Sequence, residues 1–210
     1  VVEGTPEAGA LYQLLINAEG VQISSASDLQ HLGNYDLVDR LRQAHGKQVC
    51  IISIGPAGEY KMSAASIAVT DMEQRPTRHC GRGGTGAVMG AKGIKAIVLD
   101  DTGMSMRQPQ HPEDFKTANK KFVAGLKQHP VTGEGLPAYG TNVLTNVLNE
   151  AGGYPTHNFA TGQFEGGAKI SGEALADVEN HRGGKGSATH GCHKGCIIRC
   201  SGTYYDKDGN

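Results

Sequence analysis

The stretch that constrains this chain most runs through residues 78–90 and reads Arg78-His79-Cys80-Gly81-Arg82-Gly83-Gly84-Thr85-Gly86-Ala87-Val88-Met89-Gly90. Five glycines within ten residues expose backbone N–H groups and let a ligand approach the chain closely. Arg78 and Arg82 add forked donors suited to phosphate, and a helix beginning near Thr85 would add its positive end. The stretch therefore predicts an anion cradle whose natural occupant is a phosphate or pyrophosphate group.

Two common nucleotide-binding motifs do not describe this stretch. Residues 81–86 match Gly-x-Gly-x-x-Gly as letters, but the acidic residue expected some 20 positions later has the wrong context. Asp100 and Asp101 lie near that distance, yet they end a strand that directly follows the motif's own helix. No Gly-Lys-Ser/Thr follows, so the stretch is not a P-loop. A tight glycine turn between closely packed strands is the structural alternative.

The segments around the cradle alternate between strand and helix patterns. Apolar residues 11–16 and 21–24 flank Asn17-Ala18-Glu19-Gly20, which predicts a hairpin. A helix is expected at Asn34–His45, with Gly46 after its end. Further strands are expected at 49–54, 64–70 and Ile94–Leu99, and a turn at 55–58.

The second half of the chain has helical periodicity. Helices are expected at Pro112–Gln128, 141–151 and 171–179, the last with Ser171 as its N-cap, and a flexible loop at 182–187. These helices lack continuous partners, so we expect their apolar faces to pack on structure beyond residue 210. The sequence predicts an α+β fold that divides near residue 105. Residues 1–105 form a β-sheet domain with short helices, and residues 106–210 form a mainly α-helical part.

Three cysteines, Cys192, Cys196 and Cys200, lie four residues apart within residues 191–201. On a helix this spacing would place them on one face with neighbouring Cβ atoms roughly 5–6 Å apart. In a loop, Gly195 would let the backbone wrap round a metal. Three thiolates suit three corners of a [4Fe–4S] cluster, and the fourth ligand would be distant. Cys50, Cys80 and a residue beyond 210 are all candidates for that ligand.

Other uses of the three cysteines stay open at this point. They could be small apolar residues on the buried face of a helix. They could also hold zinc together with His190 or His193, because the spacing fits a zinc site as well. A radical SAM cluster is a poorer match, since it has three and then two residues between its cysteines, whereas both gaps here are three.

Composition and charge argue against several classes of protein. With 20 basic and 21 acidic residues, nothing suggests a nucleic-acid or membrane-surface partner. No apolar run approaches the roughly 20 residues that span a bilayer, and the opening Val1-Val2-Glu3-Gly4 lacks a signal peptide's basic segment. Five cysteines, three of them within nine residues, poorly suit a secreted disulfide scaffold. We therefore expect cytoplasmic metal chemistry.

Several segments together resemble the aldehyde:ferredoxin oxidoreductase family. Residues 81–97 closely resemble a hallmark of that family, and residues 54–59 upstream do so too. Residues 150–159, 164–166 and 170–173 also match, as does the cysteine run ending at Cys200. The order and separations of these segments agree along nearly the whole chain.

The resemblance implies a tungsten or molybdenum ion between two pterin dithiolenes, with magnesium linking the pterin phosphates in well-studied members. It implies oxidation of a small aldehyde to a carboxylic acid. Electrons would leave through a [4Fe–4S] cluster to ferredoxin or another electron-transfer subunit, and a homo-oligomer is one form that the enzyme could take. Some relatives act on other substrates, including aromatic-acid thioesters. The family's proton-transfer acid would lie downstream of this chain, and the catalytic residues stay unassigned.

The resemblance also assigns residues. His79, Cys80, Gly81 and Arg82 fall where the family's loop contacts one pterin, with the Cys80 carbonyl near the magnesium ion. Many members have alanine at the position of Cys80, so its thiol is a departure. The three clustered cysteines, Cys192, Cys196 and Cys200, fall where cluster ligands belong, although the common family spacing is two residues and then three.

The family's remaining cofactor motifs lie outside these 210 residues. The resemblance therefore implies an internal segment, in which residues 1–105 are the C-terminal portion of the pterin-binding sheet domain. Residues 106–210 would be the start of the helical domain. On its own, this segment is not expected to hold either cofactor stably. The alternative functions are an iron–sulfur electron-transfer protein and a zinc-binding module, both without pterin chemistry.

Overall fold

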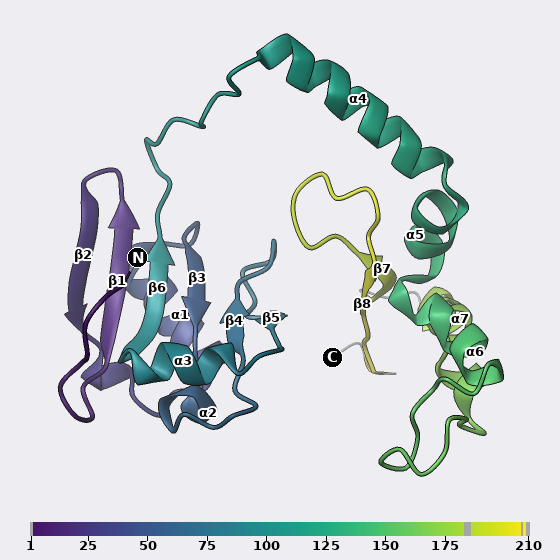
Figure 1. The fold of residues 1–210 in the computed structure, drawn as a ribbon, viewed down its shortest axis with the longest axis horizontal. Helices are drawn as coiled ribbons and strands as arrows, with labels where there is room; N and C mark the ends of the chain where they lie inside the picture. Colours follow the sequence, from purple (N-terminus) through teal and green to yellow (C-terminus); the bar gives the residue numbers. More distant parts are fainter. Residues whose placement is uncertain (1, 183–185, 207, 209–210) are drawn as a thin grey trace. The chain divides into compact units, whose positions relative to one another are not determined.

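A computed structural model describes residues 2–182, 186–206 and 208 of the chain (Figure 1). Contacts within the chain divide it into two compact units, Val1–Arg107 and Gln108–Asn210. Across the described residues, no helix is both long enough and apolar enough to span a membrane.

The first unit is built on a six-stranded mixed sheet with the order β2-β1-β6-β3-β4-β5 (Figure 1). Its strands are β1 (Tyr12–Asn17), β2 (Gly20–Ser25), β3 (Cys50–Ser53), β4 (Ile67–Val69), β5 (Arg78–Cys80) and β6 (Ile94–Leu99). β1 and β6 pair in parallel, and every other neighbouring pair in the sheet is antiparallel. This order makes β5 an edge strand, with the glycine-rich stretch at its end.

Helices close the two faces of this sheet. Helix α1 (Asn34–His45) buries Leu37, Val38 and Leu41 in the larger core cluster, together with residues of β3 and β6. Helix α3 (Thr85–Ala91) contributes Met89 to a smaller cluster with Leu14, Ile54 and Ile94. The short helices η1 (Ser27–Leu29) and α2 (Pro56–Glu59) complete the unit. Apolar burial on both faces stabilises the sheet that carries the glycine-rich stretch.

Most of the predicted elements of this unit are confirmed, including the hairpin, α1, α3 and β6. The turn predicted at 55–58 is instead the one-turn helix α2, which begins at Pro56, a residue preset for the first helical position. The strand predicted at 64–70 is shorter, because the Ala65 carbonyl accepts the Gly86 N–H from α3 rather than a strand partner. β5 was not predicted.

The second unit is mainly helical. Its helices are α4 (Pro112–Gln128), η2 (Val131–Gly135), α5 (Leu136–Tyr139), η3 (Thr141–Val143), α6 (Leu144–Glu150), η4 (Gly167–Ile170) and α7 (Gly172–Arg182). A hairpin of β7 (Ser187–His190) and β8 (Ser201–Thr203) follows. No residue of α4 is buried, and Phe115 and Phe122 are exposed. The overall fold class is α+β, as predicted.

The predictions for this unit have mixed outcomes. α4 is confirmed with its bounds, and the helix predicted at 141–151 forms as η3 followed by α6. The predicted N-cap Ser171 is confirmed, because its Oγ accepts the Ala174 N–H at 3.2 Å. Residues 183–185 of the predicted loop at 182–187 lie outside the described residues. Ser187, at the end of that loop, begins the unpredicted strand β7.

Candidate functional site

The glycine-rich stretch begins on β5, at the edge of the first sheet. β5 pairs with β4 in a register that sets Ala68 opposite His79 and Ile67 opposite Cys80. The strand ends at Cys80, so residues 81–84 lie beyond the hydrogen bonds that pair β5 with β4. The side chains at 79, 80 and 82 are exposed, so this edge presents its polar groups to ligands or to other parts of the protein.

The loop that leads into β5 is organised by one carboxylate, Asp71. Its Oδ1 accepts the N–H groups of Glu73 and Arg75, each at 2.9 Å, and its Oδ2 accepts the Thr77 hydroxyl at 2.6 Å. Burial alone would raise the pKa of Asp71, but the Thr77 and Arg75 hydrogen bonds and the Arg75 guanidinium together lower it. The ionised carboxylate thus fixes the chain just before Arg78.

At the other end of the stretch, Gly84 and Gly86 allow the backbone to pack closely against residues 63–66. Gly84 has a left-handed backbone (φ +63°), and a Cβ there would lie 2.7 Å from the Ser63 carbonyl oxygen. A Cβ on Gly86 would lie 2.5 Å from the Ser66 carbonyl oxygen. The Thr85 hydroxyl donates to the Cys80 carbonyl at 3.0 Å and so joins the two ends of the loop.

The opposite side of the loop is open. A Cβ on Gly81 or Gly83 would meet no atom within 4 Å, so a ligand can approach the backbone closely there. α3 has only seven residues, and we assign the donors to the loop N–H groups and to Arg82 rather than to the helix end. This combination of space and donors fits the phosphate-bearing end of a ligand.

His79 is held by a neighbouring side chain. The Ser66 hydroxyl lies 2.9 Å from the His79 Nδ1 atom. Because this bond occupies Nδ1, Nε2 is the ring nitrogen that His79 has available for a ligand. Ser66 could not be predicted as a partner of His79, since it is the β4–β5 pairing that brings residues 66 and 79 together.

The three clustered cysteines lie in the loop that joins β7 to β8, so the helical alternative for them is wrong. The backbone turns at Gly195 with φ +82°, as the loop alternative required. The ligand atoms of Cys192, His193 and Cys196 all lie within 4.8 Å of one another. Cys200 is outside this group, and the structure therefore brings two of the three cysteines together with one histidine.

The sulfur of Cys196 accepts hydrogen bonds from its own loop. The pKa of the Cys196 thiol is lowered, chiefly because the Arg199 N–H donates to it, while burial works in the opposite direction. The Cys192 and Ile198 N–H groups and the Cys192 thiol also lower this pKa. N–H groups that favour the anionic form of the Cys196 sulfur suit it to bind a metal ion or an iron–sulfur cluster.

The remaining two cysteines belong to the first unit. Cys50 is half-buried on β3, where its sulfur accepts the Thr70 hydroxyl at 3.7 Å. Cys80 is exposed at the end of β5. The fourth cluster ligand stays a prediction.

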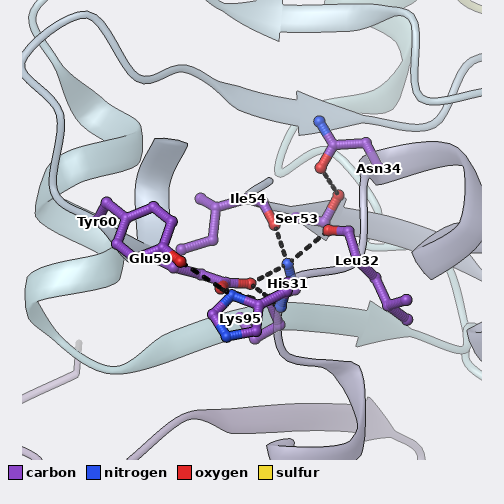
Figure 2. Close-up of polar contacts among 8 residues, drawn as sticks. All are labelled: His31, Leu32, Asn34, Ser53, Ile54, Glu59, Tyr60 and Lys95. Carbon is purple, nitrogen blue, oxygen red and sulfur yellow. Dashed lines mark hydrogen bonds and ion pairs between the residues drawn. The ribbon is translucent and has the colours of Figure 1, made fainter. Parts of the chain in front are cut away.

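The first unit also contains a buried ion pair, Lys95 with Glu59, that the sequence did not predict (Figure 2). The Lys95 side chain is fully buried on β6, and its ammonium donates to the carbonyls of Leu32 and Ile54 and to the Glu59 carboxylate. Burial lowers the pKa of Lys95, while Glu59 acts to raise it. The available signal was a lysine between Ile94 and Ala96 in an otherwise apolar strand.

The Glu59 carboxylate that pairs with Lys95 also has His31 as a partner (Figure 2). It accepts the His31 N–H at 3.0 and 3.1 Å, and its Oε2 lies 3.3 Å from the His31 Nδ1 atom. The His31 ring stacks on Tyr60 at a centroid distance of 5.9 Å. Glu59 therefore bonds to both Lys95 and His31.

Comparison with known proteins gives matches to both units. Residues 1–101 match the family model described as the N-terminal domain of aldehyde ferredoxin oxidoreductase, and residues 117–210 match the model for its domains 2 and 3. Tungsten-containing aldehyde ferredoxin oxidoreductases of Pyrococcus abyssi and Pyrococcus horikoshii are 41% and 40% identical over 177 residues. Each alignment covers 84% of this chain and 28% of the relative.

A solved structure is also similar in fold. The active-site complex BamBC of benzoyl coenzyme A reductase, determined with 1,5-dienoyl-CoA, matches with a TM-score of 0.61 at 22% identity. The match covers 93% of this chain and 30% of that one. At this identity the likeness concerns the fold alone.

Proposed function

This chain belongs to the aldehyde ferredoxin oxidoreductase family, and on that premise we propose that it forms one pterin-binding loop and the cluster loop of such an enzyme. The chain spans 28% of the length of the curated relatives. In the proposed reaction, the full-length protein oxidises a small aldehyde to a carboxylic acid. Electrons leave through a [4Fe–4S] cluster to ferredoxin or another electron-transfer subunit in the cytoplasm.

The open side of the glycine-rich loop carries this proposal. His79, Cys80, Gly81 and Arg82 would hold the phosphate end of a tungstopterin, or of a molybdopterin. Arg82 supplies a forked charged donor, and Gly81 leaves the backbone N–H accessible. The Cys80 carbonyl, which accepts the Thr85 hydroxyl, has a second lone pair for a magnesium ion. When bound, the metal–pterin group supplies the two-electron oxidation.

Cys192, Cys196 and Cys200 are the proposed protein ligands of the cluster. Thiolates are the usual ligands of [4Fe–4S] clusters, and the N–H groups around Cys196 would stabilise a negatively charged sulfur. The role of these residues is to hold the cluster and tune its reduction potential. We expect the fourth ligand to come from elsewhere in the full-length protein.

One observation favours a second candidate function. The sulfurs of Cys192 and Cys196 and a ring nitrogen of His193 lie within 4.8 Å of one another. These three atoms could be three of the four ligands of a zinc ion, with His193 as one of them. In this alternative the second unit is a zinc-binding module. The two candidates differ in their need for His193.

The proposed reaction is tested by an anaerobic assay of the full-length protein. We expect small aldehydes to drive the reduction of ferredoxin or of a low-potential dye, and an Arg82→Ala variant to lose most of this activity together with its pterin. Absence of pterin from the unaltered protein, together with zinc at one per chain, would favour the second candidate.

A further inference from the structure

The ion pair of Lys95 and Glu59 lies outside both candidate sites and is more deeply buried than either. The exposed fractions of the two side chains are 0% and 4%. Removing both charges from water is costly, and a buried pair often contributes less stability than apolar residues of similar volume. The pair's contacts with its neighbours indicate a second role.

Glu59 is the last residue of α2, and α2 packs against α3 with almost no space between them. A Cβ on Gly90 of α3 would collide with the Gly58 carbonyl oxygen. A Cβ on Gly58 would lie 2.7 Å from the Ile54 Cβ and 3.1 Å from the Gly86 carbonyl oxygen. With no side chain between the helices, a shift of α2 has to move α3 as well.

α3 in turn fixes the position of the cofactor loop, residues 81–84. The helix begins at Thr85, whose hydroxyl donates to the Cys80 carbonyl across the loop. Lys95 therefore connects to this loop through a continuous series of contacts: Glu59, the α2–α3 interface and the first turn of α3. Two backbone carbonyls, of Leu32 and Ile54, hold the ammonium in place at the other end.

We infer that Lys95 is a positioning residue for the cofactor loop, acting through Glu59 and the contact of Gly58 with Gly90. The inference rests on the proposed function only for the identity of the cofactor that the loop holds. A neutral side chain at 95 would release α2, and the loop at the end of α3 would sample other conformations. Cofactor binding would then weaken, although the sheet and its core stay folded.

A simpler role for the pair is global stabilisation, and hydrogen–deuterium exchange separates the two roles. The comparison uses the full-length protein, its Glu59→Gln variant and the double variant Lys95→Met with Glu59→Gln. Glu59→Gln keeps an acceptor for Lys95 and for the His31 N–H, and the double variant leaves no buried charge unpaired. Lys92→Met is the matched control, because Lys92 is the C-cap residue of α3 and its ammonium donates to the exposed Gly4 carbonyl at 3.1 Å instead of to Glu59.

In the double variant, we expect the rate of amide exchange in residues 81–86 to rise at least tenfold, while the rate in α1 stays unchanged. The tungsten or molybdenum content per chain should fall. Lys92→Met should match the unaltered protein. Exchange that rises equally in α1, or that stays unchanged in 81–86, would overturn the inference. If the double variant does not fold, Glu59→Gln alone is judged by the same two criteria. Metal content of the unaltered protein tests the proposed function separately.

Discussion

Thr141 donates two hydrogen bonds to the carbonyl oxygen of Cys200, one from its N–H and one from its hydroxyl, each at 2.7 Å. This pairing ties the end of the cysteine loop to the start of η3, 59 residues away in the sequence. The Cys200 backbone is therefore fixed independently of any metal.

Replacing Thr141 by valine removes the hydroxyl bond and keeps the N–H bond and the shape. We expect a loss of about 0.5–1 kcal/mol in the free energy of unfolding, because the group is exposed. Iron should also be released faster on exposure to a chelator. An unchanged rate of iron release would show that the Thr141 contact does not hold the cluster loop.

Serine replacements at Cys192 and Cys196, compared with His193→Ala, separate the two kinds of metal site. A [4Fe–4S] site should lose its iron on either cysteine replacement and keep it in His193→Ala. A zinc site of these three residues should lose metal in all three variants. Elemental analysis of each purified variant gives the answer.

Gly86 and Gly81 make a matched pair in the cofactor loop region. Alanine at 86 places a methyl 2.5 Å from the Ser66 carbonyl oxygen, and overpacking of this kind costs about 1–3 kcal/mol. Alanine at 81 meets no atom, and its effect on unfolding should stay below about 0.5 kcal/mol. Gly81→Ala should still lower the pterin content, because its methyl occupies the open side. Normal pterin content in Gly81→Ala would argue that the cofactor binds elsewhere.

Asp71 gives a prediction on pH. Its pKa is lowered in the folded protein, so its stabilising contribution is present above the unfolded pKa of about 3.9 and is lost as pH falls through the lower, folded value. The unaltered protein should therefore unfold at a higher temperature than Asp71→Asn near pH 7. The gap should close as the pH falls below about 4. A gap that does not change with pH would show that the carboxylate charge is not what holds the loop.

Helices and strands that are determined by their own residue pattern could be predicted from the sequence. The helix Asn34–His45 has an apolar stripe and a glycine after its end, and the strand Ile94–Leu99 is apolar except for Lys95. Both were predicted with their observed bounds. For the three clustered cysteines the sequence is consistent with either a helix or a loop, because a spacing of four suits both. The structure has a loop, in which Gly195 turns the backbone with φ +82°.

Features that depend on contacts between residues distant in the sequence could not be predicted from local sequence patterns. β5 is a polar three-residue strand that exists because β4 pairs with it. The grouping of His193 with Cys192 and Cys196 depends on the loop between β7 and β8, neither of which was predicted. Lys95 was visible as a charge within an apolar strand, but its partner Glu59 follows only from the packing of α2 against the sheet.

The proposed function is tested most directly by elemental and pterin analysis of the anaerobically purified full-length protein. We expect tungsten or molybdenum, an extractable pterin and about four iron atoms per chain. Zinc at one per chain, with neither tungsten nor molybdenum and no pterin, would contradict it.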